Sequence, residues 1–375
     1  MIKRIKQMLI KEFLQMLRDR RMRAVIFGMP VIQLVIMSFA LTTDVMNIRT
    51  AVLDMDKTPS SRELIDEFTG GGYFKIIKTL QSEADIKDLL DRAGVRAVIH
   101  IPQGFESALK SGSTAPVQVL TDGTDSNSTA IAQGYAAGII QGYSNEKLMD
   151  QLQKSGMPRM KPPVETVERA FFNENQESRF YFVPSLIAVM LFIFSLILTS
   201  ISIVKEKEIG TIEQVMVTPI RKFEFILGKT IPFMITSYIS MTIMLIVAFF
   251  VFDIVIKGNI FLFYLLSGLY LFGNMGVALI ISASASTQQQ AMLTSFLILM
   301  PCVMLSGFMF PIKNMPDIVQ YATWLNPMRW YLEILRGIVM KDVGLAVLWP
   351  AVAAQATLAV TFISIAWVKF SKTLS

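Results

Sequence analysis

The chain has 375 residues, of which 53% are hydrophobic and 17% are charged, and its mean hydropathy is +0.51. These values exclude an ordinary soluble globule and predict a membrane protein. The net charge of +6 is unevenly spread: residues 44–181 hold 15 Lys and Arg against 19 Asp and Glu, whereas the rest of the chain holds 20 against 10. This asymmetry follows the positive-inside rule, so the charge gives no reason to expect a nucleic-acid partner. The single cysteine, Cys302, excludes an intrachain disulfide.

Residues 1–23 predict a basic amphipathic helix. Eight of them are Lys or Arg, and apolar residues recur at steps of three or four. Such a helix either lies in the cytoplasmic interface against membrane lipid or packs on the protein's own cytoplasmic side. Residues 24–42 form the first apolar run, just long enough to span a membrane. Because this run is longer than a signal-peptide core, an uncleaved anchor is favoured over a cleaved signal peptide.

The composition of residues 43–180 predicts a soluble extracytoplasmic domain of α/β or α+β class, inserted between the first and second membrane spans. Strands are predicted at 49–54, 74–78, 96–101 and 117–120, helices at 60–68, 83–92, 104–110 and 125–152, and a returning strand at 164–173.

The residues of this domain predict no catalytic group and no metal site. The one histidine of the chain, His100, lies within an apolar strand, where packing is the usual role. Asp54, Asp56, Asp122 and Asp125 are the carboxylates that suggest a metal site. They lie at strand ends and turns, however, where aspartate commonly bonds to nearby backbone, so we expect no bound metal.

Five further apolar runs predict an α-helical polytopic membrane protein with six transmembrane helices, five of them in residues 181–375. The runs are 181–204, 231–252, 260–283, 291–310 and 345–368. Charge at their ends places both termini in the cytoplasm. An outer re-entrant region is predicted near residues 311–340, where Arg329, Glu333 and Arg336 share one helical face. Simple pairing of these side chains within one helix is the alternative.

Residues 205–219 differ from the apolar runs around them. Four consecutive charges at residues 205–208 would be costly in hydrocarbon, but the apolar residues that follow at helical spacing give a helix one apolar face. Thr211 and Gln214 fit a capping box, and Pro219 disfavours further helix. The pattern predicts either a short helix that contacts another cytoplasmic protein or a solvated loop between two spans.

Two further patterns bear on the energy source. Gly228-Lys229-Thr230 looks like the end of a phosphate loop, but Phe223 stands where that motif requires glycine, so we expect no ATP hydrolysis by this chain. The apolar runs carry ionisable residues only near their ends, which argues against a carrier driven by protons or ions. Candidates for a translocation path or outer gate are Met300, Met304, Phe308, Asn326 and Glu333.

The order of these elements resembles the permease subunits of type-2 ABC exporters, particularly the multidrug-efflux-like branch. Residues 205–219 read KEKEIGTIEQVMVTP and are similar to that family's signature, (R/K)E(R/K)E-x-GT-x-EQ-x-x-VTP. Residues 287–292, 305–316 and 326–338 are similar to its later motifs. The resemblance covers essentially the whole chain, although the extracytoplasmic domain matches more loosely.

The resemblance implies two permeases, either two copies of this chain or this chain with a paralogue, and two separate ATP-binding subunits. ATP and Mg would then bind to those subunits, and this chain would hold no cofactor. A coupling helix near residues 209–217 would sit in a groove of the ATP-binding subunit, with three glutamates pairing to basic groups there. The implied coupling residues are Glu206, Glu208, Ile209, Gly210, Thr211, Glu213, Gln214, Val217, Thr218 and Pro219.

The function that the resemblance implies is export of apolar or amphipathic, drug-like compounds across a bacterial inner membrane. A periplasmic membrane-fusion adaptor is a further candidate partner for the extracytoplasmic domain. One alternative is export of a lipid-linked or polysaccharide substrate. Another is a membrane-anchored receptor whose external domain binds a ligand.

Overall fold

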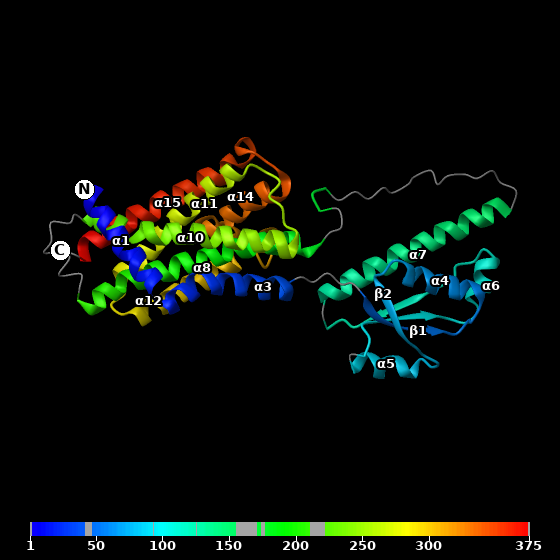
Figure 1. Cartoon of the computed structure of the whole chain (residues 1–375). Coiled ribbons are helices and arrows are strands. Elements are labelled where there is room, and N and C mark those ends of the chain that lie inside the picture. The colour runs from blue at the N-terminus through cyan, green and yellow to red at the C-terminus, as the bar shows by residue number, and fades with distance from the viewer. Residues whose placement is uncertain are drawn as a thin grey trace. The chain divides into compact units, whose positions relative to one another are not determined.

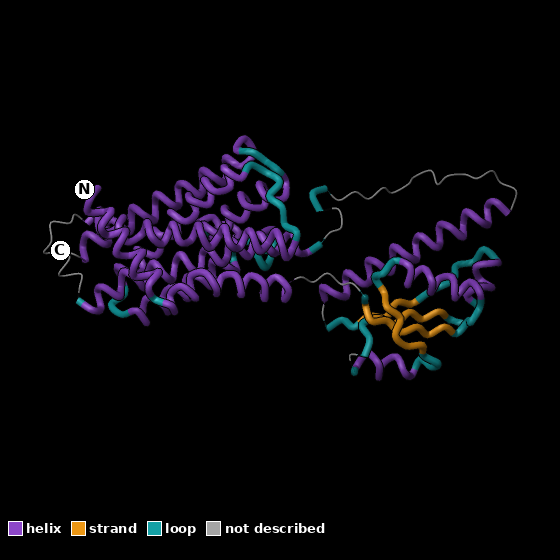
Figure 2. The backbone as a smooth tube through the Cα atoms, viewed as in Figure 1, coloured by secondary structure: helices purple, strands orange, loops and turns teal. Residues whose placement is uncertain are grey.

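The computed structural model describes residues 2–41, 47–92, 94–124, 126–154, 171–173, 177–210 and 222–373. They belong to two compact units, one of residues 1–42 and 170–375, here called the helical unit, and one of residues 43–169, here called the α/β unit. Figure 1 labels their elements, and Figure 2 shows that all the strands belong to the α/β unit.

A mixed sheet of four strands forms the centre of the α/β unit, in the order β2-β1-β3-β4 (Figure 2). β1 pairs in parallel with β2 and β3, and β4 runs antiparallel to β3. The strands are β1 Ile48–Asp54, β2 Phe74–Thr79, β3 Ala97–Ile101 and β4 Gln118–Thr121, and the helices are α4 Pro59–Gly70, α5 Ala84–Asp91, α6 Phe105–Lys110 and α7 Ser126–Lys154. These elements confirm the predicted strands and helices to within about two residues, and the mixed sheet with its helices fits the predicted α/β or α+β class.

Alternating side chains give this sheet two apolar faces. Val52 of β1 packs with Leu64 and Phe68 of α4 and with residues of α7, whereas Leu53, its neighbour in β1, packs on the face covered by α5. This alternation is the period of two that made the strands recognisable in the sequence. Of the returning strand predicted at residues 164–173, only 171–173 are described, and they are not a strand; the remainder lies outside the described residues.

Asp54 and Asp56 hold loops of the α/β unit together. Asp54 Oδ1 accepts the backbone N–H groups of Asp56 and Lys57 at 3.0 and 2.9 Å. Asp56 accepts those of Gly104 and Glu106 at 2.8 and 2.9 Å, which ties the loop after β1 to the loop after β3. These carboxylates therefore bind backbone, the role that their places at strand ends predicted.

The helical unit contains the remaining elements of the described residues. They are α1 Ile2–Arg18, α2 Arg20–Arg23, the π-helix η1 Ala24–Gly28, α3 Met29–Leu41, α8 Ser178–Ile209, α10 Lys222–Phe252, α11 Ile260–Ser284, α12 Gln288–Met304, the 3-10 helix η2 Ile312–Asn314, α13 Asp317–Ala322, the 3-10 helix η3 Thr323–Leu325, α14 Pro327–Lys341 and α15 Leu345–Thr373. α8 lies in the middle, against α3, α10, α11, α12 and α14.

Helices α11 and α15 pack closely against each other. A side-chain Cβ at Gly276 of α11 would lie 2.9 Å from the backbone nitrogen of Ile363 and from Cβ of Phe362. Only glycine allows the two backbones to approach so closely, as is usual where helices pack inside membranes.

Five helices in the described part of the chain are long and apolar enough to span a membrane: Ala24–Leu41, Ser178–Ile209, Glu224–Phe252, Ile260–Ser284 and Leu345–Lys369. Five of the six predicted spans therefore coincide with helices that are long and apolar enough to cross a membrane. The remaining run, predicted at 291–310, forms α12, which has 17 residues and is about 25 Å long. It ends early because the chain turns at Ser306 and Gly307, and Gly307 takes a left-handed conformation with φ +81°.

We expect Asp56→Asn to loosen the two loops that its carboxylate joins. Partial burial raises the pKa of Asp56, but hydrogen bonds from Thr58, Glu106 and Gly104 outweigh it and leave this pKa below its ordinary value. The stabilisation is therefore fully present above the ordinary carboxyl pKa of about 3.9 and is lost as the pH falls through the lower folded-state pKa.

At neutral pH the backbone amides of Gly104 and Glu106 should exchange with deuterium about tenfold faster in this variant, because they lose an ionised acceptor. Hydrogen exchange read by mass spectrometry on the whole chain measures this. Asp66→Asn, which changes an exposed carboxyl group on α4, is the matched control. Unchanged protection of both amides in Asp56→Asn would contradict the assignment.

Candidate functional site

The signature at residues 205–219 divides between the last turn of α8 and a stretch outside the described residues. α8 was expected to end at residue 204, but it continues through the four charges to Ile209. Gly210 then ends the helix in a left-handed conformation, with φ +79° and its N–H donating to the carbonyl of Lys207. A residue with a Cβ is strained there, which explains the glycine. The side chain of Ile209 is exposed.

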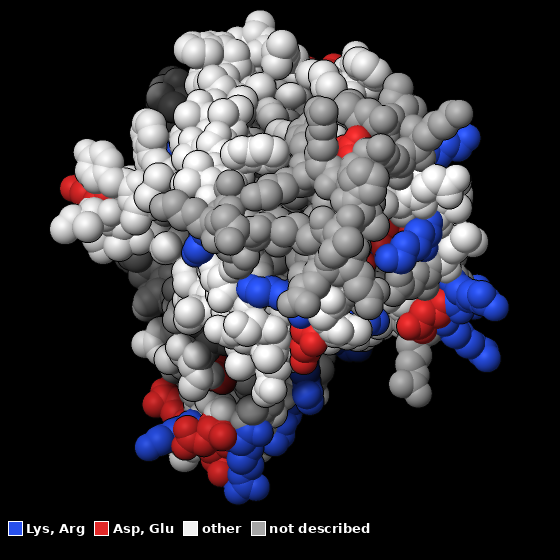
Figure 3. All heavy atoms as spheres, turned by 90° about the vertical axis from the view of Figure 1, so that its left-hand side faces the viewer, with Lys and Arg blue, Asp and Glu red and all other residues white. Residues whose placement is uncertain are grey.

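The predicted coupling helix at 209–217 is described only at its first two residues, which belong to the end of α8. Thr211, Glu213, Gln214, Val217, Thr218 and Pro219 lie outside the described residues. The chain resumes at α10, so residues 211–221 connect the ends of α8 and α10. Both ends lie at the end of the helical unit that carries α1, here called the α1 end (Figure 1). Lys and Arg side chains reach the surface of this end, several of them beside Asp or Glu (Figure 3).

A buried ion cluster joins three elements at the α1 end. Lys229 of α10 lies between two carboxylates, with its Nζ 2.7 Å from Glu12 Oε1 of α1 and 2.6 Å from Glu206 Oε1 of α8. The side chains of Lys229, Glu12 and Glu206 are 3%, 4% and 12% exposed. We call these three residues the ion brace.

The ion brace is stable only as a whole, because a charge buried without its partner is costly. Lys229 supplies one positive charge against two carboxylates, and Lys11, 3.5 Å from Glu206 Oε1, supplies the second. The four charges then sum to zero. Lys11 is largely exposed, so its contribution is that of a surface ion pair and the buried ammonium of Lys229 is the essential cation.

A second set of contacts ties the same turn of α8 to the turn between α11 and α12. Glu208 Oε2 accepts the backbone N–H of Gln288 at 3.0 Å and its side-chain amide at 2.9 Å. Lys207 Nζ donates to the carbonyl of Ala285 at 3.0 Å. Glu206, Lys207 and Glu208 therefore bind within this chain, where they hold the end of α8 in place.

Helix α1 packs on α10. Met8 lies over Gly228, where an added Cβ would be 2.9 Å from its sulfur. Glu12 and Met16 are buried along the same side, whereas Ile10 and Leu14 are exposed. Of the two predicted settings of this helix, packing on the protein itself is thus observed. Contact of its exposed apolar side chains with lipid stays a prediction.

The five candidates for a translocation path lie in different surroundings. Met300 and Met304 are exposed on α12, and Glu333 is exposed on α14. Phe308 is buried with its ring edge-on to Phe182. Asn326 is a structural cap, since its Oδ1 accepts the N–H of Met328 at 3.0 Å and its Nδ2 donates to the carbonyl of Cys302 at 2.7 Å.

The two arginines of α14 bind across the fold. Arg336 donates to Ser185 Oγ at 3.0 and 3.1 Å and to the carbonyl of Gly307 at 3.2 Å, and it lies 3.9 Å from the ring centre of Tyr181. Arg329 donates to the carbonyl of Gln320 at 3.2 Å and stacks on tryptophan rings. These contacts favour a folded return through α13 and α14 over simple pairing within one helix.

Sequence reasoning missed two members of the ion brace. Glu12 is the one acidic residue among the first 18, and Lys229 is a lone cation just before an apolar run. Each is unusual in its surroundings, and that isolation was the available signal. The same Lys229 belongs to the triplet that resembled a phosphate loop; its buried ion pairs account for its place here.

Comparison with known proteins extends over nearly the whole chain. Residues 20–368 match the family described as ABC-2 family transporter protein. Probable multidrug ABC transporter permease YbhR of Escherichia coli strain K12 is 33% identical over 361 residues, which cover 95% of this chain and 96% of that protein. Probable multidrug ABC transporter permease YbhS of the same strain is 26% identical over 377 residues, which cover 99% of this chain and 98% of that protein. Inner membrane transport permease YhhJ of the same strain is 26% identical over 371 residues, covering 97% and 96%.

We expect Lys229→Met to destabilise the helical unit by about 3–5 kcal/mol, because it removes the buried ammonium that pairs with both Glu12 and Glu206. Thermal unfolding of the purified chain in detergent measures this. Lys11→Met, which removes the exposed cation, should cost less than about 1 kcal/mol. Should Lys229→Met prevent folding, the triple change Glu12→Gln/Lys229→Met/Glu206→Gln should restore it, since a buried ion pair can be replaced by uncharged groups. Equal stability of Lys229→Met and Lys11→Met would contradict the brace.

Proposed function

Because the chain belongs to the ABC-2 family of transporter proteins, we propose that it is the permease subunit of an exporter driven by a separate ATP-binding subunit. Family membership identifies a multi-pass membrane permease that works with an ATP-binding subunit. We add that transport is outward and that the substrates are apolar or amphipathic, drug-like compounds of the cytoplasm or inner leaflet. The similarity to a protein named as a probable multidrug permease, at 33% identity over 95% of this chain, carries this choice of substrate.

The proposed assembly has two permeases and two ATP-binding subunits in a bacterial inner membrane. The permeases are two copies of this chain or this chain with a paralogue. The α1 end and both termini face the cytoplasm, and residues 43–180 lie on the opposite, extracytoplasmic side of the membrane. A membrane-fusion adaptor is a candidate partner for them there. The excess of Lys and Arg outside residues 44–181 supports this orientation.

Residues 209–217 are proposed to seat in the ATP-binding subunit. The ion brace supports this role, because residues 211–221 leave α8 shortly after Glu206 and enter α10 shortly before Lys229. A displacement of this connection therefore acts on two helices that share one buried cation, and through Glu12 on α1 as well. Glu206 and Glu208 bind within the chain, so we assign the contact with the partner to Ile209 and Glu213.

The energetic requirement is a difference in binding between two permease conformations. ATP shifts the equilibrium only if the ATP-binding subunit, in its ATP-bound form, binds one conformation of this connection better than the other. An amphipathic compound that also prefers one conformation then changes the rate of ATP hydrolysis. Stimulated ATPase activity is therefore the direct readout of coupling.

We expect Gly210→Ala and Glu213→Gln each to reduce drug-stimulated ATPase activity several-fold, while the chain still inserts and copurifies with its ATP-binding subunit. Gly210→Ala strains a left-handed residue by about 1–2 kcal/mol, and Glu213→Gln removes one charge from the proposed contact. The measurement uses the chain reconstituted in liposomes with the ATP-binding subunit and an amphipathic dye as substrate.

Matched controls change the same residue types in α7 of the α/β unit, as Gly134→Ala and Glu146→Gln. Normal stimulation in both Gly210→Ala and Glu213→Gln would overturn the coupling assignment. Stimulation by a lipid-linked saccharide and not by the dye would overturn the substrate class. Failure to copurify with an ATP-binding subunit would instead favour the receptor.

A further inference from the structure

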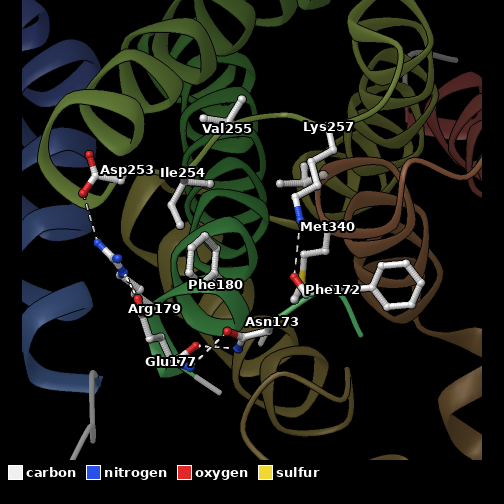
Figure 4. A pocket seen from close by; sticks show the side chains of 11 residues that line it. Phe172, Asn173, Glu177, Arg179, Phe180, Asp253, Ile254, Val255, Lys257 and Met340 are labelled. Carbon is white, nitrogen blue, oxygen red and sulfur yellow. Dashed lines mark hydrogen bonds and ion pairs between the residues drawn. The ribbon is translucent and has the colours of Figure 1, made fainter. Parts of the chain in front are cut away.

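A pocket of about 420 Å³ opens at the end of the helical unit opposite α1 (Figure 4). It lies where α8 begins, where α10 connects to α11, and where α14 ends. Its lining is apolar in the middle and charged at the sides, and consists of Phe172, Asn173, Glu177, Arg179, Phe180, Asp253, Ile254, Val255, Lys257, Val339 and Met340.

Both carboxylates of the lining are held by one arginine. Arg179 Nη1 donates to Asp253 Oδ2 and to the carbonyl of Phe252, each at 3.1 Å, and its Nε pairs with Glu177. This group of three occupies one side of the pocket (Figure 4). Because Glu177 and Asp253 are already bound to a guanidinium, they are poor ligands for an additional cation.

Lys257 lies on the other side of the pocket, near Phe172 (Figure 4), and Lys341, which follows the lining residue Met340, lies near the Phe172 ring without lining the pocket itself. Lys257 Nζ donates to the carbonyl of Phe172 at 3.4 Å, and Lys341 Nζ is 5.9 Å from the centre of the Phe172 ring. Within the part of the chain that the structure describes, neither lysine has an ion-pair partner. The carbonyl occupies one donor of Lys257, so at least two N–H donors remain there for an anion.

The wall between Lys257 and the Arg179 group is apolar. Figure 4 shows Phe180 and Ile254 in the middle of the pocket, Val255 above them and Met340 near Lys257. A ligand that fits both parts has an anionic group next to an alkyl chain. The volume lies within the range of ligand pockets in proteins, about 300–1,000 Å³.

We propose that this pocket binds the phosphate headgroup of an anionic phospholipid. Lys257 binds the phosphate oxygens, and the first methylene groups of an acyl chain lie against Phe180, Val255 and Met340. A phosphate suits the free N–H donors of this ammonium group because it has several charged acceptor oxygens. The pocket lies at the ends of α8 and α10, two of the helices long enough to span a membrane, and headgroups are found at that depth. Lipid binding at this site does not depend on which substrate the protein transports.

Native mass spectrometry of the full chain in detergent tests the site, with dihexanoyl phosphatidylglycerol as the probe. We expect saturable binding of one probe molecule per chain, weakened about tenfold or more in Lys257→Gln, because its charged hydrogen bonds to the phosphate are lost. Lys313→Gln removes one exposed lysine of η2, away from the pocket, and should bind like the wild type.

Three further probes identify the ligand class. Inorganic phosphate and glycerophosphoglycerol carry the anion without acyl chains, and dihexanoylglycerol carries the chains without the phosphate. Each should bind at least tenfold more weakly than the complete lipid, and Val255→Ser should weaken the lipid alone. Equal affinity for the deacylated phosphates would show a plain anion site, and equal affinity for dihexanoylglycerol a plain apolar one; either result overturns the proposal. Unchanged binding in Lys257→Gln overturns it as well.

Discussion

The buried ammonium of Lys229 constrains the whole α1 end of the molecule. It lies between carboxylates of α1 and α8 and belongs to α10, so one side chain joins residues up to 217 positions apart in the sequence. Removing these charges from water is costly, and the cost is recovered only while all three groups are in contact. Helices α1, α8 and α10 are therefore expected to move as one body at this end.

This constraint determines what the signature can do. Within the chain, Glu206 pairs with Lys229 and Glu208 accepts hydrogen bonds from the start of α12. These contacts fix the end of α8, from which residues 211–221 continue. α8 then carries any displacement through the middle of the helical unit, where it contacts most of the other helices. At its other end, α8 begins beside the pocket that holds Arg179. One continuous helix thus extends from the coupling connection to the proposed lipid site.

Much of the fold followed from local patterns. Strand alternation located β1 and β3 within one residue, and apolar runs located the spanning helices, because both signals depend on residues near in sequence. The errors arose where contacts between distant residues decide the structure. α8 extends past residue 204 because its charges find partners on other helices, and α12 stops short because the chain turns at Gly307. The spacing of Arg329, Glu333 and Arg336 left two interpretations open, a re-entrant region and pairing within one helix. The hydrogen bonds of Arg329 to Gln320 and of Arg336 to Ser185 favour the first.

A cross-link between α1 and α10 tests the account most directly. In a Cys302→Ser background, Met8→Cys and Gly228→Cys place two thiols where the native Met8 side chain touches the backbone of α10. If the brace moves as one body, the oxidised, cross-linked permease should hydrolyse ATP with its partner subunit and respond to drug as the reduced protein does. Loss of drug stimulation on oxidation, recovered on reduction, would show that α1 must separate from α10 during the cycle and would contradict the account.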